Sequence, residues 1–428
     1  MECRTFSRVL TALLVVASFL VSTPAFAADC TPEISSNGNL TVIAFKTVGT
    51  CTWSTPAGLT MFKGLIIGGG GGGGSAMGGG GGGGGYVEFD SLTATSEVFT
   101  IVVGDGGIAG TATNSGPAGV SGGNSSISGT GITLTSRGGA GGASLYSGGH
   151  PAQLNGGSGG GAAGYSGYTS INSTGTQTSQ TQTPLLSTIG GKQYGFDGSP
   201  AGTTWYPGGG GGAGASGTNS PANGGAGRAN AILGTSYLWA GGGGGSGYSG
   251  DGGNGGSGGG GAGGTSYATP SNPGTGGINT STTATYVGSA GASNTGGGGG
   301  GGTWGSLGAK GGSGIVILSY LSYVGPASVS LQLASNAISA GYRSTTIVEA
   351  LVNTAGLVTF YQAGKLIPGC KNRATTGTSP NIKATCSWKP AIHGSVSLSA
   401  KIAPSSASYS ANSSTIYRVP VGARSGQR

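Results

Sequence analysis

Short apolar and β-branched stretches recur along this chain, and longer polar or glycine-rich segments separate them. Their content of valine, isoleucine, leucine and aromatic residues is typical of β-strands. In the first three quarters of the chain they are residues 40–45, 65–67, 86–89, 98–103, 132–134 and 315–320. No helix of two turns with an apolar face is expected after residue 27. The pattern predicts an all-β protein.

The first and last of these stretches bracket the whole glycine-rich region. A long flexible linker would not end in the apolar run 315–318. We therefore expect one β-sandwich with glycine-rich excursions between its strands. The longest glycine runs are residues 68–74, 78–85, 208–212, 241–245, 258–261 and 296–302.

Composition leaves two interpretations of these runs. The chain has 102 glycines among 428 residues, whereas glycine is about 7% of an average protein. Since glycine loses the most backbone entropy on ordering, the runs could be flexible coil. They could also pack side by side as polyproline-II-like helices, in which an eight-residue run would span about 25 Å. Only 7% of residues are charged, which is too few to solvate a disordered chain and favours packing.

Aromatic residues lie close to several glycine runs. They are Trp205, Tyr206, Tyr237, Trp239 and Trp304. They could cover the faces of packed glycine helices, or they could be exposed and available for binding.

The first 27 residues have the features of a signal peptide. Arg4 and Arg8 precede an apolar run at 9–21, and small residues Ala25 and Ala27 form a cleavage site. We predict removal of residues 1–27 and a secreted or cell-surface protein. The alternatives are a retained anchor and a lipid-modified Cys30, but the run is short for a membrane span.

An even number of cysteines remains after this segment. They are Cys30, Cys51, Cys370 and Cys386. In an exported chain this favours disulfides, and two local bridges, 30 to 51 and 370 to 386, are the simplest pairing. Buried free thiols are the alternative.

Charge divides the mature chain near Tyr323–Val324. Residues 28–323 carry 6 Lys and Arg against 8 Asp and Glu, whereas residues 324–428 carry 10 Lys and Arg against Glu349 alone. We expect a glycine-rich sandwich in the first part and a small β-sandwich with a short basic tail in the second. The basic residues, including Arg418, Arg424 and Arg428, would attract an anionic cell-wall polymer or acidic polysaccharide. Solubility explains the charge equally well.

Four stretches of the first part carry a resemblance. They are Cys-Thr-Trp-Ser-Thr-Pro-Ala-Gly-Leu at 51–59, Gly-Leu-Ile-Ile-Gly at 64–68, Phe-Thr-Ile-Val-Val-Gly at 99–104 and Gly-Gly-Ser-Gly-Ile-Val-Ile at 311–317. Together they resemble the bacterial secreted glycine-rich domain family. The plan is also similar to the glycine-rich module of anaplastic lymphoma kinase-type receptors and to phage tail-tip adhesins. The resemblance implies a jelly-roll or tumour-necrosis-factor-like sandwich carrying polyglycine II helices, with a binding or scaffolding role. No ligand-contacting residue is carried over.

The second part resembles bacterial immunoglobulin-like repeats. The resemblance is carried by Val-Thr-Phe-Tyr at 358–361, Gly-Lys-Leu-Ile-Pro-Gly-Cys at 364–370, Ala-Thr-Cys-Ser-Trp-Lys-Pro at 384–390 and Gly-Ser-Val-Ser-Leu at 394–398. It implies a bridge between Cys370 and Cys386, with Trp388 in the core beside it. Such modules usually space or present other domains.

Residues that could carry chemistry are sparse. The two histidines, His150 and His393, are far apart in the sequence, and neither belongs to a zinc-binding motif. Glu88 and Asp90 alternate along one predicted strand and would share a face, as two carboxylates of a glycoside hydrolase could. The alternative is that the two carboxylates lie on a solvent-exposed strand face without a catalytic role.

Calcium, cofactors and nucleic acid find little support in the sequence. Asp251 and Asn254 lie in a glycine-rich stretch similar to calcium-binding nonapeptides, but the nine-residue period is missing. We expect no catalytic, metal or cofactor site, and no nucleic acid partner. The leading hypothesis is a non-enzymatic adhesion protein that binds an unknown cell-surface glycan or protein. The alternatives are a self-associating matrix protein and, third, an extracellular hydrolase.

Overall fold

The computed structural model describes residues 30–56, 59–96, 98–111, 118–145, 155–164, 174–201, 207–248, 250–266, 270–321, 325–378, 381–405 and 409–422. The predicted signal peptide, residues 1–27, and the predicted boundary at Tyr323–Val324 lie outside these ranges. Within them the chain is all-β, as predicted. Its helices are the short 3₁₀ segments η1 (Gln177–Ser179), η2 (Leu186–Ile189) and η3 (Ala334–Asn336). No helix in the described ranges is long and apolar enough to span a membrane.

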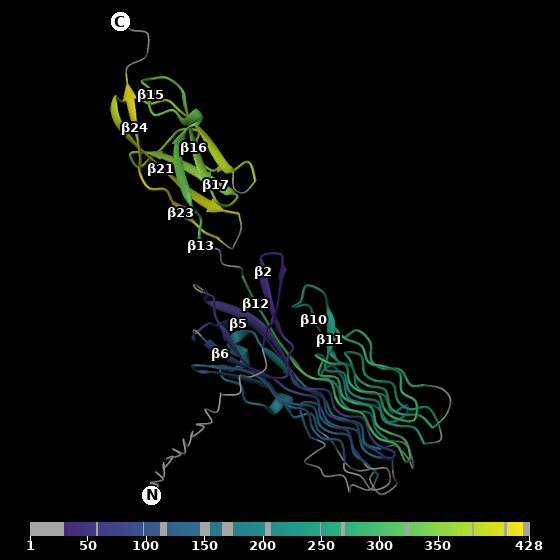
Figure 1. Cartoon of the computed structure of the whole chain (residues 1–428). Helices are drawn as coiled ribbons and strands as arrows, with labels where there is room; N and C mark the ends of the chain where they lie inside the picture. Colours follow the sequence, from purple (N-terminus) through teal and green to yellow (C-terminus); the bar gives the residue numbers. More distant parts are fainter. Residues whose placement is uncertain are drawn as a thin grey trace, which may run out of the picture.

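Two antiparallel sheets form a sandwich in the N-terminal part (Figure 1). One has the order β1-β2-β12-β4-β5-β9, and the other has the order β3-β6-β7-β8. The strands are β1 (Glu33–Asn37), β2 (Leu40–Phe45), β3 (Gly49–Ser54), β4 (Met61–Ile67), β5 (Tyr86–Thr93), β6 (Val98–Val103), β7 (Ser125–Gly129), β8 (Ile132–Ser136), β9 (Lys192–Tyr194) and β12 (Ile315–Leu321). The expected sandwich is thus confirmed, while its jelly-roll topology stays a prediction.

The six-stranded sheet is buried on both faces. Alternate residues of β12 show this: Val316 and Leu318 pack in the core between the two sheets, whereas Ile315 and Ile317 pack on the other side. There the hairpin of β10 (Arg228–Asn230) and β11 (Tyr237–Trp239) covers the sheet. Burial on both faces explains why β12 is a continuous apolar run.

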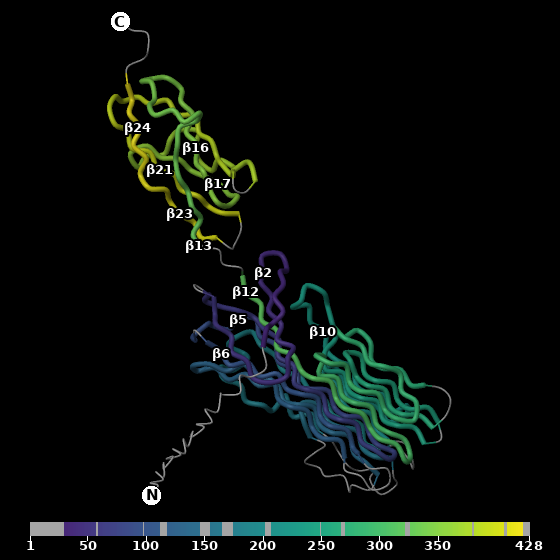
Figure 2. Tube along the Cα trace, viewed as in Figure 1, coloured from purple at the N-terminus to yellow at the C-terminus, as the bar shows by residue number. Residues whose placement is uncertain are grey.

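The glycine runs pack side by side and extend from the sandwich (Figure 2). Residues 68–74 leave β4, turn at 75–77 and return as 78–85 into β5. Every third amide of 68–74 donates to the returning segment, with N···O distances of 2.8 to 3.1 Å. The amides between them donate to residues 120–123 and 309–312. Hydrogen-bond partners therefore repeat every three residues. We call this packed assembly the glycine raft.

The longest runs occupy the most enclosed places in the raft. Carbonyl groups of 68–74 accept from three further neighbours, so this segment is surrounded on six sides. Among the described residues, the segments with six hydrogen-bonded neighbours are 68–74, 78–85, 208–213, 241–247 and 296–302. A Cβ atom added at Gly71 would lie 1.8 Å from the carbonyl oxygen of Ala140. Position 71 therefore accepts only glycine, because an added Cβ atom would overlap the neighbouring backbone.

The C-terminal part has two main sheets around one core. Their orders are β14-β16-β20 and β15-β24-β21-β17-β18, with β19 beside β17 and β23 beside β21. Strands β13 and β22 form a separate pair. The strands are β13 (Gly325–Pro326), β14 (Val329–Leu333), β15 (Ala340–Gly341), β16 (Thr346–Val352), β17 (Gly356–Gln362), β18 (Lys365–Leu366), β19 (Arg373–Ala374), β20 (Ile382–Trp388), β21 (Gly394–Pro404), β22 (Tyr409–Ser410), β23 (Asn412–Ser413) and β24 (Tyr417–Gly422).

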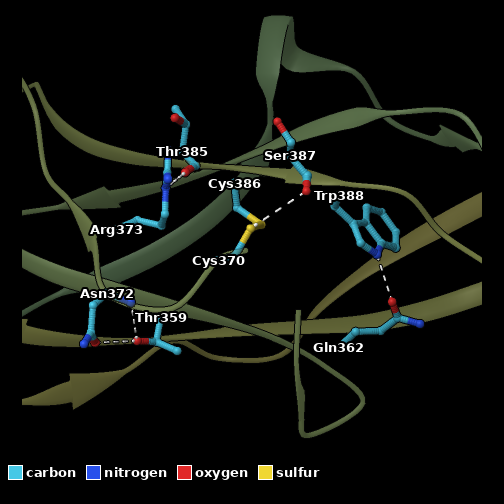
Figure 3. Close-up of a disulfide and its surroundings, with 9 residues drawn as sticks. All are labelled: Thr359, Gln362, Cys370, Asn372, Arg373, Thr385, Cys386, Ser387 and Trp388. Atoms are coloured by element: carbon cyan, nitrogen blue, oxygen red, sulfur yellow. Dashed lines mark hydrogen bonds between the residues drawn. A yellow bond between two sulfur atoms is a disulfide. The ribbon is translucent and has the colours of Figure 1, made fainter. Parts of the chain in front are cut away.

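Both predicted cysteine pairs are disulfides, Cys30 with Cys51 and Cys370 with Cys386. Figure 3 shows the second bridge, with Trp388 on the same strand as Cys386. The Trp388 ring is buried, and its indole N–H donates to the Gln362 amide oxygen at 2.8 Å. The expectation that Trp388 lies in the core near this bridge is confirmed.

Candidate binding surface

Three exposed aromatic side chains gather at the end of the raft that lies away from the sandwich. Tyr248, Tyr286 and Trp304, which we call the aromatic tip, are between 42% and 63% exposed. Backbone hydrogen bonds fix their segments: Ser246 N–H donates to Gly78 O beside the 75–77 turn, and Thr303 N–H donates to Tyr286 O. The rings of Tyr248 and Trp304 lie 6.2 Å apart in an edge-to-face arrangement. The tip is therefore held by the raft itself.

The arrangement of the tip is suited to contact. Tyrosine and tryptophan supply large apolar faces with a polar edge, and they lose little conformational freedom on binding. Such faces stack on the apolar faces of sugar rings or enter pockets of a protein partner. The raft adds rigidity, because interior segments are hydrogen-bonded on all sides.

The aromatic residues singled out from the sequence divide between core and surface. Trp239 is fully buried, and Tyr237 packs beside it with ring centroids 6.1 Å apart. These two cover the six-stranded sheet, whereas Trp304 lies at the tip. Trp205 and Tyr206 lie outside the described residues.

Sequence reasoning missed Tyr248 and Tyr286. Tyr248 follows the enclosed segment 241–247 directly, just as Trp304 follows 296–302 after one threonine. An aromatic residue placed after an outgoing glycine segment is the signal that would have found Tyr248. No comparable signal marks Tyr286, which is brought to the tip by its hydrogen bond to Thr303.

Glu88 and Asp90 share a face of β5, as strand alternation predicted. Both line a cavity of about 250 Å³, together with Lys63 of β4 and with Asn230 and Ile232 from the region of β10. The intervening Phe89 points into the core between the sheets.

Hydrogen bonds tie the Glu88 carboxylate to its surroundings. It accepts from the Tyr86 hydroxyl at 2.6 Å and from the Asn230 amide at 2.9 Å. Burial, followed by the hydrogen bond to Glu88, raises the pKa of the Tyr86 hydroxyl far above its usual range. The phenol therefore stays protonated and remains a donor. The hydrogen bonds among Tyr86, Glu88 and Asn230 connect the β10–β11 hairpin to β5, so Glu88 has a structural role.

Asn254 bridges raft segments. Its side-chain oxygen accepts the backbone N–H of Asn272 at 2.9 Å, while its own N–H donates to the Asn223 side chain at 2.8 Å. Asp251, which lies in the same glycine-rich stretch, is exposed. Within the described ranges no group of three or more His, Cys, Asp and Glu is placed to hold a metal ion.

Glu349 is the only acidic residue among residues 324–428, and its charge is balanced by a neighbouring lysine. The Glu349 carboxylate pairs with the Lys383 ammonium at 2.8 Å and accepts from the Gln332 amide at 2.9 Å. The Lys383 hydrogen bond, followed by that of Gln332, lowers the pKa of Glu349. The remaining cations of the described C-terminal ranges thus face no free carboxylate.

Two of these cations lie on the outer face of the larger C-terminal sheet. On β21 the residues Val396, Leu398, Ala400 and Ile402 point into the core, so Lys401 points outward. Arg418 of β24 is paired with the outward residue Ser397. This face therefore combines hydroxyl groups with positive charge. Arg424 and Arg428 lie outside the described residues.

The two histidines do not form a site in the described structure. His393 stacks on the Tyr342 ring with centroids 3.8 Å apart. Arg343 lies over the same ring at 5.1 Å. His150 lies outside the described residues.

Comparison with known families gives one match, a family model described as a glycine-rich domain, over residues 46–321. This range begins directly after β2 and extends through β12, so it includes most of the sandwich and the whole raft. Among curated proteins no match was found.

Proposed function

Because the chain belongs to the glycine-rich domain family, we propose that it is a secreted or cell-surface, non-enzymatic binding protein. The raft holds the aromatic tip against a glycan or protein on another surface. The observation that carries this proposal is the group of three exposed aromatic side chains on a hydrogen-bonded scaffold. Two disulfides support an oxidising compartment. Removal of residues 1–27 as a signal peptide is part of the proposal.

The raft suits this task through its backbone structure. A repeat of three residues is that of polyproline II, so we interpret the glycine segments as polyglycine II helices. Cα–H···O contacts between closely packed glycines add to the N–H···O bonds. A preformed surface does not have to be ordered on binding, which preserves affinity.

The C-terminal part is proposed as an immunoglobulin-like spacer that also contacts an anionic cell-wall polymer or acidic polysaccharide. Two sheets around one core support the first role, as does the Cys370–Cys386 bridge, which ties β20 to the segment between β18 and β19. The outward Lys401 and Arg418 and the neutralised Glu349 support the second.

The tip is tested by binding of the purified chain to a glycan array and to intact cells. We expect Trp304→Ala to weaken binding at least tenfold, because aromatic contacts are frequent hot spots. Phe196→Ala is the matched control, since Phe196 is an exposed aromatic near the sandwich end of the raft. Equal binding by Trp304→Ala and wild type would refute the role of the tip.

The polymer contact is tested separately with polyphosphate and polygalacturonate. We expect binding that weakens with salt and is lost in the double variant Lys401→Glu, Arg418→Glu. Lys192→Glu, an exposed change in the sandwich, should leave it intact. If binding neither weakens as the salt concentration rises nor decreases in the double variant, the proposal is contradicted.

The non-enzymatic assignment is tested with a panel of glycans. Turnover by wild type that disappears in both Glu88→Gln and Asp90→Asn would overturn it and favour the hydrolase alternative.

A further inference from the structure

A cavity lies beside the β10–β11 hairpin, on the face of the six-stranded sheet that this hairpin covers. Trp239 of β11 packs in the apolar cluster on this face, whereas the chain turns back after β10, with Gly234 N–H donating to Ala231 O at 2.9 Å. Ile232 marks the boundary, because it belongs to the apolar cluster and also lines the cavity of about 250 Å³. Apolar packing therefore ends where the charged side chains of β4 and β5 begin.

An irregularity in β5 lies at the cavity. Between the opposed pairs 62–92 and 64–89, two residues of β5, Asp90 and Ser91, face the single residue Lys63 of β4. This is the arrangement of a β-bulge, which bends the strand, changes the direction of its side chains and is common next to active sites. Both Lys63 and Asp90 line the cavity. The bulge thus accompanies a gathering of charged groups on one side of the sheet.

The charged groups of the cavity retain hydrogen-bonding capacity. Elsewhere in the described chain opposite charges close into ion pairs of 2.6 to 2.8 Å. Lys63 and Asp90 line the same cavity, yet neither forms an ion pair or a side-chain hydrogen bond with a described residue. Both hydrogen bonds that the Glu88 carboxylate accepts from described side chains reach Oε2. They hold the carboxylate in place and leave Oε1 available.

A buried hydroxyl group lies next to Lys63. Ser319 of β12 is the direct partner of Lys63 across the sheet, so the two side chains lie on the same face. Ser319 is 1% exposed, and its Oγ atom has no hydrogen-bond partner among the described residues. Buried polar groups are nearly always hydrogen-bonded. This end of the sheet face therefore offers polar contacts that the described chain does not complete.

The combination of groups selects a ligand class. An anion would meet two carboxylates, and a cation would meet the Lys63 ammonium. A hydroxyl group both donates and accepts, so neighbouring hydroxyl groups can donate to Glu88 Oε1 and to Asp90 while they accept from Lys63. The cavity is smaller than the roughly 300–1,000 Å³ of sites for drug-sized molecules, which limits the ligand to about one ring. We propose that this cavity binds a single neutral hexose unit through its vicinal hydroxyl groups.

NMR titration of the purified chain with glucose, galactose, mannose and L-alanine tests the cavity. At least one hexose should bind with a Kd on the order of 1 mM, and zwitterionic alanine should not. Asp90→Ala and Lys63→Met should each weaken hexose binding at least tenfold, because each removes a group that contacts the hydroxyls. Asp251→Ala and Lys365→Met, matched changes at exposed positions outside the cavity, should leave binding unchanged. Equal melting temperatures would show that the cavity variants are folded.

The aromatic tip provides a second control, because it lies at the end of the raft away from the sandwich. Trp304→Ala should bind the hexose as wild type does. Binding that is lost in Trp304→Ala and kept in Asp90→Ala would place the sugar at the tip and overturn the proposal. A wild type that binds none of the three hexoses, or that binds alanine more tightly than any of them, would also overturn it. Failure of the tip to bind cells or glycans would leave hexose binding in the cavity unaffected.

Discussion

Replacement of Gly71 by alanine tests whether the raft is as closely packed as described. The added Cβ atom would lie 1.8 Å from Ala140 O, about 1.2 Å short of the 3.0 Å that real Cβ contacts keep. The obstacle is backbone, so no side-chain rotation relieves it. The segment 68–74 must move, and it has neighbours on all six sides.

The cost follows from overpacking and from lost hydrogen bonds. Overpacking of a close-packed interior costs about 1–3 kcal/mol. Gly71 N–H donates to Gly82 O at 2.8 Å, and Gly71 O accepts from Gly299 N–H at 2.9 Å. A displacement of this size breaks at least one of these bonds, at about 1 kcal/mol. Alanine also stiffens the unfolded chain, which returns about 0.4–1 kcal/mol. We expect a net loss of about 2 kcal/mol.

Differential scanning calorimetry measures this loss, which corresponds to a fall in melting temperature of about 4 °C at roughly 2 °C per kcal/mol. Gly250→Ala is the matched control, because no atom lies within 4 Å of its added Cβ and its backbone is outside the left-handed region. Both changes stiffen the unfolded chain equally, so their difference reports packing alone. If the two variants melt at the same temperature, the enclosed glycine segments are not packed as described.

Three further predictions concern single contacts. The double change Cys370→Ser, Cys386→Ser opens a loop of sequence separation 16 and should cost about 3 kcal/mol in urea denaturation; an unchanged midpoint would contradict this. The pKa of Glu349 is lowered from 4.5, so its stabilising contribution is present above pH 4.5 and is lost as pH falls through the lower folded-state pKa. Glu349→Gln, which cannot pair with Lys383 as an anion, should lack this part of the acid sensitivity, and identical pH profiles would argue against the ion pair. Asn254→Ala leaves a neighbouring backbone N–H without its acceptor and should cost about 1 kcal/mol by thermal melting, whereas Asn254→Asp retains the acceptor and should cost less.

Local patterns were sufficient for six strands of the sandwich and for the disulfides, whereas β1, β3, β7 and β9 were not predicted. The stretches 40–45 and 98–103 coincide with β2 and β6, because β-branched and aromatic residues report strands directly. The cysteine pairs followed from an even count and short separations. These features depend on residues close together in the sequence.

The packing of the raft could not be predicted in the same way. A run of identical glycines carries no side-chain pattern that specifies its neighbours or its register. The sequence does show how many glycines follow one another, and the longest glycine runs lie in the enclosed segments. The sequence also shows whether an aromatic residue comes before or after a glycine segment. Trp239 precedes the outgoing segment 241–247 and is buried at the sandwich, whereas Trp304 follows the outgoing segment 296–302 and lies at the tip. The direction of each segment is known only once the fold is known.

The raft separates positions that determine the fold from positions that are free for function. Interior positions accept only glycine where a Cβ atom would meet backbone, and the other interior positions hold small residues such as Ala140 and Ala162. Exposed positions of two neighbouring segments at the surface of the raft, 104–111 and 306–313, hold residues as different as Asp105, Ile108 and Lys310, so the backbone does not select them. Side chains at these positions can therefore change with little effect on stability.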